Sequence, residues 1–246
     1  MLRSLKGMLI YGLEAADGDI GRCRDFLFDD RRWVVRYVVV DTGKWLPDRK
    51  VLISPAVVKD ADWNRMRLVV TMTKAQIEKS PHLDADAPVS RQYEKTWLEH
   101  YGLPFYWAVG NLWSSPRHGI KLLAEARDQD MDEEAVAEPH LRSTQEVMGY
   151  RIQAADGELG HVEDFIVEDG WTLRYMVVDT RNWLPGRKVL VSPAWVGKFE
   201  WAAEKVHVDL RCGEIKASPA YDPKAPVNRE YEMRLYDYYG RPVYWK

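Results

Sequence analysis

The stretch Trp33-Val-Val-Arg-Tyr-Val-Val-Val-Asp41 decides the fold, because it returns as Trp171-Thr-Leu-Arg-Tyr-Met-Val-Val-Asp179. Both stretches are rich in β-branched and aromatic residues, as a largely buried β-strand requires. The offset of 171 − 33 = 138 positions holds to the end of the chain, and the segments 33–107 and 171–245 share 35 identical residues. A similarity of that extent at one fixed period indicates an internal duplication.

The duplication also extends toward the N-terminus. Leu2-Arg3-Ser4 returns as Leu141-Arg142-Ser143 at an offset of 141 − 2 = 139, and Asp25-Phe26 returns as Asp164-Phe165 at the same offset. The sequence therefore predicts two modules, residues 1–107 and 140–246. Residues 108–139 have no counterpart and end in a run of acidic side chains, so we expect an irregular, acidic linker there.

Each copy is predicted to be mainly β. Asp17-Gly18 and Asp156-Gly157 are hairpin signals. Short β-branched runs follow at 50–54 and 67–71, with counterparts at 188–192 and 205–210. Several short strands at close spacing favour a small closed barrel, because closure removes exposed strand edges. The expected fold class is mainly β with short helices: two small β-barrels in tandem, each followed by a helical extension.

The helical extension carries an aromatic stripe. Ser90 and Asn228 are good N-caps for a helix in each copy. Aromatic and leucine side chains then recur at a spacing of four, which places them on one helix face. The stripe packs either on its own barrel or against the other copy. The residues that we regard as candidates for packing between modules are Tyr93, Trp97 and Tyr101, with Tyr231, Leu235 and Tyr239 in the second copy.

The composition excludes several classes of protein. The net charge is −3, with 35 basic and 38 acidic residues, so no nucleic-acid partner is expected. The two cysteines, Cys23 and Cys212, fall at non-equivalent points of the repeat, which argues against a disulfide framework and favours a cytoplasmic location. No signal peptide and no transmembrane segment are expected, since no apolar run is long enough.

Catalytic chemistry is hard to find in either copy. None of the six histidines repeats, and no ligand-spaced cluster or nucleophile motif occurs, so we expect no catalytic residue, no metal and no cofactor. One loop of each copy does combine aromatic and cationic groups, as partner-binding hot spots do. The alternative is a Trp lid with solvated charges. The candidate partner-binding residues are Asp41, Trp45, Arg49 and Lys50, with Asp179, Trp183, Arg187 and Lys188 in the second copy.

An ordered series of motifs, present twice, resembles the PRC-barrel family. The series begins with Gly-Asp-Ile-Gly at 18–21 and Gly-Glu-Leu-Gly at 157–160, and continues through Arg-Tyr-x-Val-Val-Asp-Thr-x-x-Trp-Leu-Pro-x-Arg-Lys-Val-Leu-x-Ser-Pro from Arg36 and from Arg174. The tails 88–107 and 226–245 resemble the extension of stand-alone bacterial members. The family is named for the cytoplasmic domain of the photosynthetic reaction centre H subunit, and it also includes a domain of a ribosome-maturation factor.

The resemblance implies a small barrel used for binding or assembly, not an enzyme. The chain departs from the reaction-centre subunit in being doubled and in having no transmembrane helix, which argues against a direct photosynthetic role. We therefore expect a non-enzymatic cytoplasmic adaptor that docks on a protein partner or a membrane-associated complex. The alternative is a small-molecule-binding or regulatory protein with its site at the seam between the barrels. The two copies are expected to form an intramolecular pseudo-dimer, with homo-oligomers of the whole chain as a further expectation.

Overall fold

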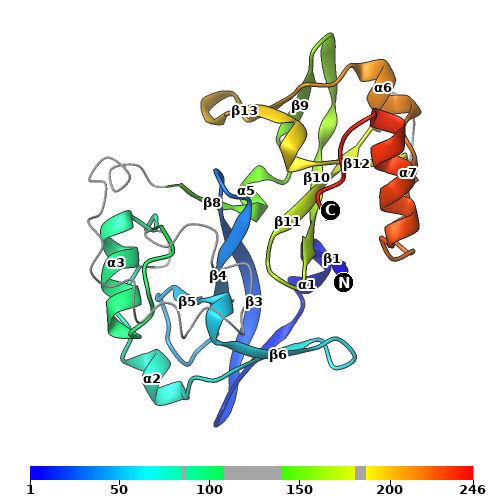
Figure 1. Ribbon diagram of the computed structural model, residues 1–246. Helices are drawn as coiled ribbons and strands as arrows, with labels where there is room; N and C mark the ends of the chain where they lie inside the picture. The colour runs from blue at the N-terminus through cyan, green and yellow to red at the C-terminus, as the bar shows by residue number, and fades with distance from the viewer. Residues whose placement is uncertain (85–86, 108–139, 181–186, 246) are drawn as a thin grey trace. The chain divides into compact units, whose positions relative to one another are not determined.

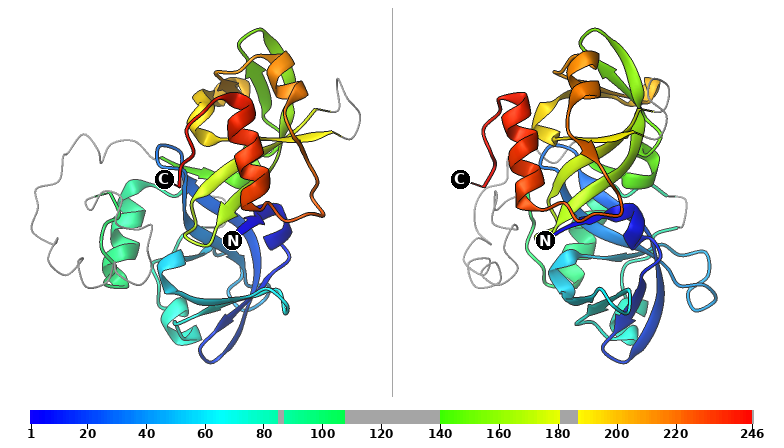
Figure 2. Two further views of the ribbon diagram at one scale, coloured as in Figure 1. Left: turned by 45° about the vertical axis from the view of Figure 1, so that its right-hand side comes forward. Right: turned by 90° about the vertical axis from the view of Figure 1, so that its right-hand side faces the viewer.

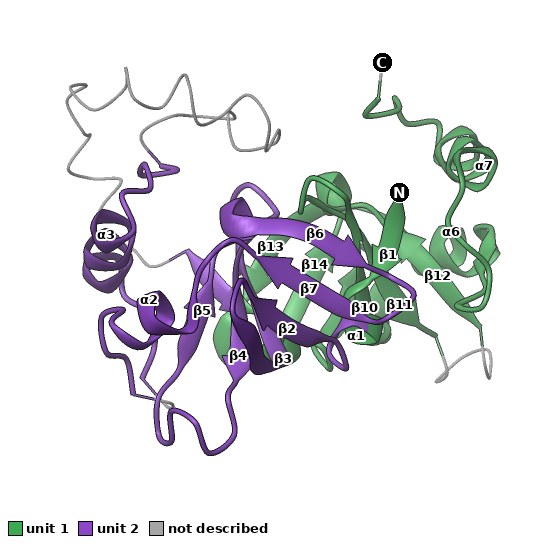
Figure 3. Ribbon diagram, turned by 90° about the horizontal axis from the view of Figure 1, so that it is seen from below, with its two compact units in different colours: residues 1–7, 143–246 green, residues 8–142 purple. Residues whose placement is uncertain are grey.

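The computed structural model describes residues 1–84, 87–107, 140–180 and 187–245, so the predicted linker at 108–139 lies outside the described residues. The chain divides into two compact units. Unit 1 consists of Met1–Gly7 together with Ser143–Lys246, and unit 2 is Met8–Arg142 (Figure 3). The units therefore do not coincide with the sequence repeats, because the first seven residues belong with the second copy.

Unit 2 is a curved sheet in the strand order β5-β4-β3-β2-β7-β6, with β8 pairing to β3. The parallel pair is β2 with β7, and the other neighbours along this order are antiparallel. Its elements are β2 (Gly12–Ala15), β3 (Gly18–Asp29), β4 (Val34–Asp41), β5 (Val51–Ile53), η1 (Pro55–Val57), β6 (Val58–Asp62), β7 (Arg67–Val70), α2 (Lys74–Glu78), α3 (Arg91–His100) and β8 (Leu141–Ser143) (Figure 1).

Unit 1 repeats this arrangement in the order β13-β14-β9-β10-β11-β12-β15, with β1 pairing to β10. Its elements are β1 (Leu2–Ser4), α5 (Thr144–Val147), β9 (Arg151–Ala154), β10 (Gly157–Glu168), β11 (Leu173–Asp179), β12 (Lys188–Val191), η4 (Pro193–Trp195), β13 (Val196–Glu200), η5 (Trp201–Ala203), β14 (Lys205–Val208), α6 (Cys212–Ala217), β15 (Ala220–Tyr221) and α7 (Arg229–Tyr239), and α1 (Leu5–Met8) begins in this unit (Figure 2).

The prediction of a mainly β protein with short helices is confirmed, but the sheets are not closed barrels. Among the described residues, the two end strands of each sheet are not hydrogen-bonded to each other. One edge of each sheet is covered in another way. Val189 of β12 pairs with Ala220 of β15, and in unit 2 Arg49 forms an isolated bridge to Asp84. A short connecting segment thus protects the edge that barrel closure was expected to remove.

The long strands β3 and β10 bend at bulges, and a glycine makes the bend possible. The backbone φ is +133° at Gly21 and +59° at Gly160. A Cβ atom would lie 2.1 Å from the carbonyl oxygen of Asp41 at the first position and 1.9 Å from that of Asp179 at the second. Only glycine allows so close an approach of two backbones. This requirement explains why the second glycine of each Gly-x-x-Gly motif is present in both copies.

The strand that opened the sequence analysis forms the centre of each core. From Val35 to Val40, every residue of β4 is buried, as expected for a strand covered on both faces. Helix α3 lies against this strand, and its Trp97 side chain is fully buried. Both long helices begin at the predicted caps, because Ser90 accepts a hydrogen bond from the Tyr93 amide and Asn228 does the same for Tyr231.

Each sheet also contains a strand from the other sequence repeat. Strand β1 pairs antiparallel with β10, so that Leu2 lies opposite Glu168 and Ser4 opposite Ile166. Strand β8, from the start of the second repeat, pairs with β3. Within the described part of the chain, no helix has the length and apolar character needed to cross a bilayer.

Candidate functional site

The aromatic stripe of each terminal helix packs within its own unit. The Trp97 ring lies edge-on to Tyr37 of β4, with the ring centroids 5.2 Å apart. Around it, Tyr93 donates a hydrogen bond to the Pro81 carbonyl at 2.9 Å, and Tyr101 donates to the Gln76 carbonyl at 3.3 Å. These contacts correspond to the first arrangement considered from the sequence, in which the stripe rests on its own sheet.

The second copy reaches the same packing with a different tryptophan. Leu235 stands where the first copy has Trp97, and Trp195 of η4 stands where the first copy has Val57. The Trp195 ring lies 4.6 Å from Tyr239, which matches the 4.6 Å between Trp97 and Tyr101. In addition, Tyr231 donates to the Pro219 carbonyl at 3.0 Å. The large ring is thus supplied by α3 in the first copy and by η4 in the second.

A buried network of charged and phenolic groups lies beneath the first stripe. The Glu94 side chain is 1% exposed. Its Oε2 accepts from Arg91 at 3.0 Å, and its Oε1 accepts from the Tyr106 hydroxyl at 2.6 Å. The Arg36 guanidinium lies 4.0 Å above the Tyr106 ring and forms an ion pair with Asp29 at 3.1 Å. Charges buried in this way must be paired to be tolerated.

The second copy repeats the network with the equivalent residues. The Oε1 atom of Glu232 accepts from the hydroxyls of Tyr175 and Tyr244, both at 2.8 Å, and Arg229 pairs with Oε2 at 3.0 Å. The Arg174 guanidinium stacks 4.0 Å from the Tyr244 ring. Each network joins β4 or β11, the terminal helix and the Tyr-Trp tail. The duplicated Arg-Tyr, Arg-x-x-Glu and Tyr-Trp motifs therefore act together to hold the helical extension against the sheet.

Burial dominates the ionisation of the first network. Burial raises the pKa of Glu94 to about 7, although the Arg91 charge and the Tyr106 hydroxyl oppose the rise. Burial and the nearby Glu94 carboxylate also raise the pKa values of Tyr37 and Tyr106. A carboxylate with a raised pKa is often a functional group. Here the side chain is enclosed by protein, so the geometry supports a structural role.

The side chains of the first candidate partner-binding loop make contacts within the protein that the sequence did not predict. Asp41 accepts from the Gly43 amide at 2.9 Å and forms a local turn, while Trp45 lies 4.8 Å from the Lys74 ammonium. Arg49 donates to the last carbonyls of α2, including that of Glu78 at 2.6 Å. Such a cation at a helix C-terminus stabilises the helix. The arginine thus has a structural use, and partner binding at this loop stays a prediction.

The second candidate loop is only partly described. Asp179 is buried, and Arg187 donates to the Ser218 carbonyl at the end of α6. Lys188 forms an ion pair with Glu163 at 2.7 Å, whereas its counterpart Lys50 donates to a backbone carbonyl. Trp183 lies outside the described residues. The capping arginine is the feature that both loops share.

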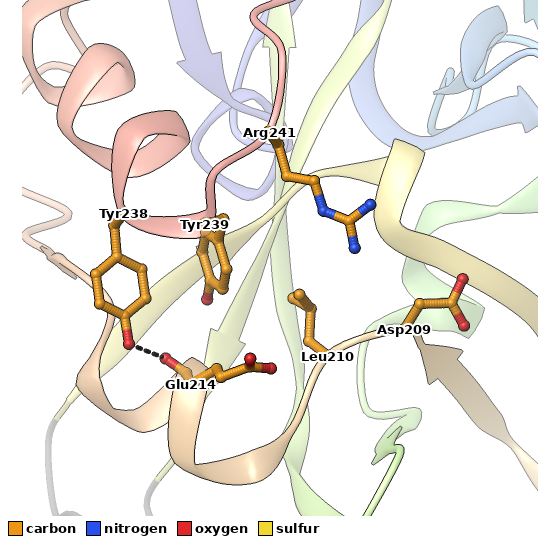
Figure 4. Close-up of a pocket in the computed structure, with 6 residues that line it drawn as sticks. All are labelled: Asp209, Leu210, Glu214, Tyr238, Tyr239 and Arg241. Atoms are coloured by element: carbon orange, nitrogen blue, oxygen red, sulfur yellow. Dashed lines mark hydrogen bonds between the residues drawn. The ribbon is translucent and has the colours of Figure 1, made fainter.

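A polar cleft of about 250 Å³ lies in unit 1, and sequence reasoning missed it (Figure 4). Arg241, two positions after the end of α7, points toward the space above Leu210 and Asp209. Tyr238 donates to the Glu214 carbonyl at 2.9 Å. The sequence signal that could have revealed this cleft is a difference between the copies, because the charged residues that line it are absent from the first copy. The lining residues Asp209, Leu210, Glu214, Tyr238, Tyr239 and Arg241 stand at the positions of Thr71, Met72, Gln76, His100, Tyr101 and Leu103, and only the tyrosine at 239 and 101 is shared.

The described residues bear on two further kinds of chemistry, metal binding and thiol reactivity. Among the described residues, no group of three or more His, Cys, Asp or Glu side chains is arranged to hold a metal ion. The Cys23 thiol is flanked in sequence by Arg22 and Arg24, yet burial and the nearby Asp25 raise its pKa above the ordinary value. A buried thiol of this kind is unreactive.

No family model and no curated protein that was searched matches the chain.

Proposed function

We propose that the protein is a non-enzymatic binding or assembly protein, made of two PRC-like modules, that docks on a protein partner or a membrane-associated complex. The observation that supports this proposal best is the use of the duplicated ionisable residues. Arg49 caps a helix, Arg91 and Glu94 fasten another helix, and Arg36 neutralises a buried aspartate. What the duplication preserves is thus a scaffold, as expected when function lies in contact surfaces.

The sheets can be regarded as opened variants of a PRC barrel. In each sheet, the long bent strand pairs with one neighbouring strand along its first part and with another along the rest. The terminal helix covers the central strand. Such a module offers loops at the sheet ends for a partner, while the helix face is already used. The loop at Trp45 is therefore the surface to which we assign docking, while its counterpart at Trp183 lies outside the described residues.

A photo-crosslinking experiment tests the adaptor. A photoreactive phenylalanine analogue replaces Trp45 in the full chain, and the matched control carries it at Trp63, in the turn between β6 and β7. We expect a discrete adduct with one macromolecule at position 45 and none at position 63. Equal adducts from both positions, or no adduct from either, would contradict docking through this loop.

The polar cleft supports one second candidate, a small-molecule-binding protein. Its charges occur in one copy only, and the guanidinium of Arg241 shares the space with the carboxylate of Asp209. A small ligand with both an anionic and a cationic group would satisfy both. The seam expected from the sequence is not involved, because every lining residue belongs to unit 1. A thermal-shift screen of free amino acids, repeated with Arg241→Ala and with Arg65→Ala of unit 2 as the control, tests this candidate. A stabilisation that survives Arg241→Ala excludes it.

A further inference from the structure

We propose that the edge of β10 at Ile166–Glu168, together with Asp164, is a docking site for the N-terminal segment of another copy of the module. Copies of the module would associate by exchanging this segment reciprocally. The proposed partner is a second copy of the module, because the segment that pairs with this edge in the structure, Met1–Gly7, is the start of the other repeat. The proposal does not depend on the adaptor function.

The first argument is the pairing of the strand. Strand β10 pairs with β9 only from Gly157 to His161, while β11 occupies its other edge up to Val167. The edge at Ile166–Glu168 is thus left open, and β1 fills it in antiparallel register. An open edge presents unpaired backbone donors and acceptors to any extended segment, which is the basis of binding by strand addition.

The second argument is a specific anchor beside that edge. Asp164 is buried, and its carboxylate accepts from the Ser4 hydroxyl at 2.5 Å and from the Lys6 amide at 2.8 Å. The Ser4 hydroxyl oxygen also accepts from the Gly7 amide at 2.9 Å, so the Ser4 side chain both caps the short helix α1 and contacts Asp164. Leu5, next to this serine, is fully buried. Removing the segment would leave a buried carboxylate without these two donors.

The third argument is reciprocity. In unit 2, strand β8 of the second repeat pairs with β3, and the Asp30 amide donates to the His140 carbonyl at 2.9 Å. The Asp30 carboxylate also pairs with Arg142 at 3.0 Å. In unit 1, the equivalent Asp169 pairs with the Met1 ammonium. Each copy therefore supplies its N-terminal segment and offers a strand edge that receives the segment of the other copy. This is the arrangement of a strand-exchanged dimer whose two subunits are joined in one chain.

A full-chain disulfide experiment tests the exchange. In a chain with Cys23→Ala and Cys212→Ser, the pair Arg3→Cys and Val167→Cys occupies opposite positions of β1 and β10. A protease site is inserted at 108–139, and the oxidised protein is cut. We expect the two fragments to stay covalently joined on a non-reducing gel. The matched control, Arg3→Cys with Phe28→Cys, replaces the position of the first copy that is equivalent to Val167. A bond that forms only in the control would show that the segment folds back on its own repeat, and would overturn the proposal.

A peptide experiment tests docking between separate molecules. A chain without residues 1–7 is titrated with a labelled synthetic peptide of residues 1–8. We expect saturable one-to-one binding that Asp164→Asn weakens by about tenfold, as loss of charge-assisted hydrogen bonds predicts. Asp25→Asn changes the equivalent carboxylate of the other copy and should leave the affinity within about twofold. Binding that is indifferent to Asp164, or no binding to a folded truncated chain, would refute the docking site. If the truncated chain does not fold, the disulfide experiment decides.

Discussion

The buried carboxylate of Glu94 predicts a specific dependence of stability on pH. The folded-state pKa is about 7, and the ordinary value is 4.5. Below pH 4.5 the group is protonated in both states and contributes nothing to the dependence. As the pH rises from 4.5 to 7, the unfolded chain loses this proton while the folded chain keeps it, so the free energy of unfolding falls. Since one pKa unit corresponds to about 1.4 kcal/mol, the expected loss is about 3 kcal/mol.

The substitution Glu94→Gln removes this contribution, because glutamine is neutral in both states. We therefore expect wild type to lose about 3 kcal/mol more than Glu94→Gln between pH 4.5 and pH 7. Urea unfolding, followed through the tryptophan fluorescence of the whole chain, measures the difference at each pH. Glu99→Gln, an exposed position on the same helix, is the matched control. Parallel curves for wild type and Glu94→Gln would refute the raised pKa of Glu94 in the folded protein.

Two further predictions follow from burial and backbone geometry. Gly160→Ala should destabilise the protein by about 3 kcal/mol or more, because its Cβ meets a carbonyl oxygen, whereas Gly213→Ala in α6 has open space and should be neutral or slightly stabilising; thermal unfolding distinguishes the two. In the folded protein, Cys212 should react with a thiol reagent and Cys23 should not, since Cys23 is buried and Cys212 is partly exposed. Rapid labelling of both cysteines before unfolding would contradict this assignment.

The elements that could be read locally were predicted well. The strand at 34–41 has the β-branched pattern of a doubly covered strand, and it is buried almost throughout. The helices after Ser90 and Asn228 begin where a capping side chain meets the start of an amphipathic pattern. These features depend on residues within a few positions of each other, so one sequence suffices to identify them.

The contacts of the candidate site residues could not be read from the sequence, because their geometry depends on distant partners. Arg49 looked like one member of a docking loop, yet its side chain caps a helix that ends 29 positions later. The cleft beside Arg241 involves five other residues from three parts of the chain, with no shared motif. The closed barrel failed as a prediction because pairing between the end strands is a property of the curved sheet, which bulges and short covering strands decide.

The sequence by itself determined that one module occurs twice, which strands form its centre, and where its helices begin, since periodicity and capping are local. Only the tertiary structure decided which copy receives the first strand. Leu-Arg-Ser and Asp-Phe occur in both copies, so either pairing satisfies the same pattern. The Ser4 hydroxyl bonds to Asp164, 160 positions away, and a contact of that range leaves no trace in local periodicity. The hydrogen bond from Tyr175 of β11 to Glu232, 57 positions away, became visible for the same reason only in three dimensions.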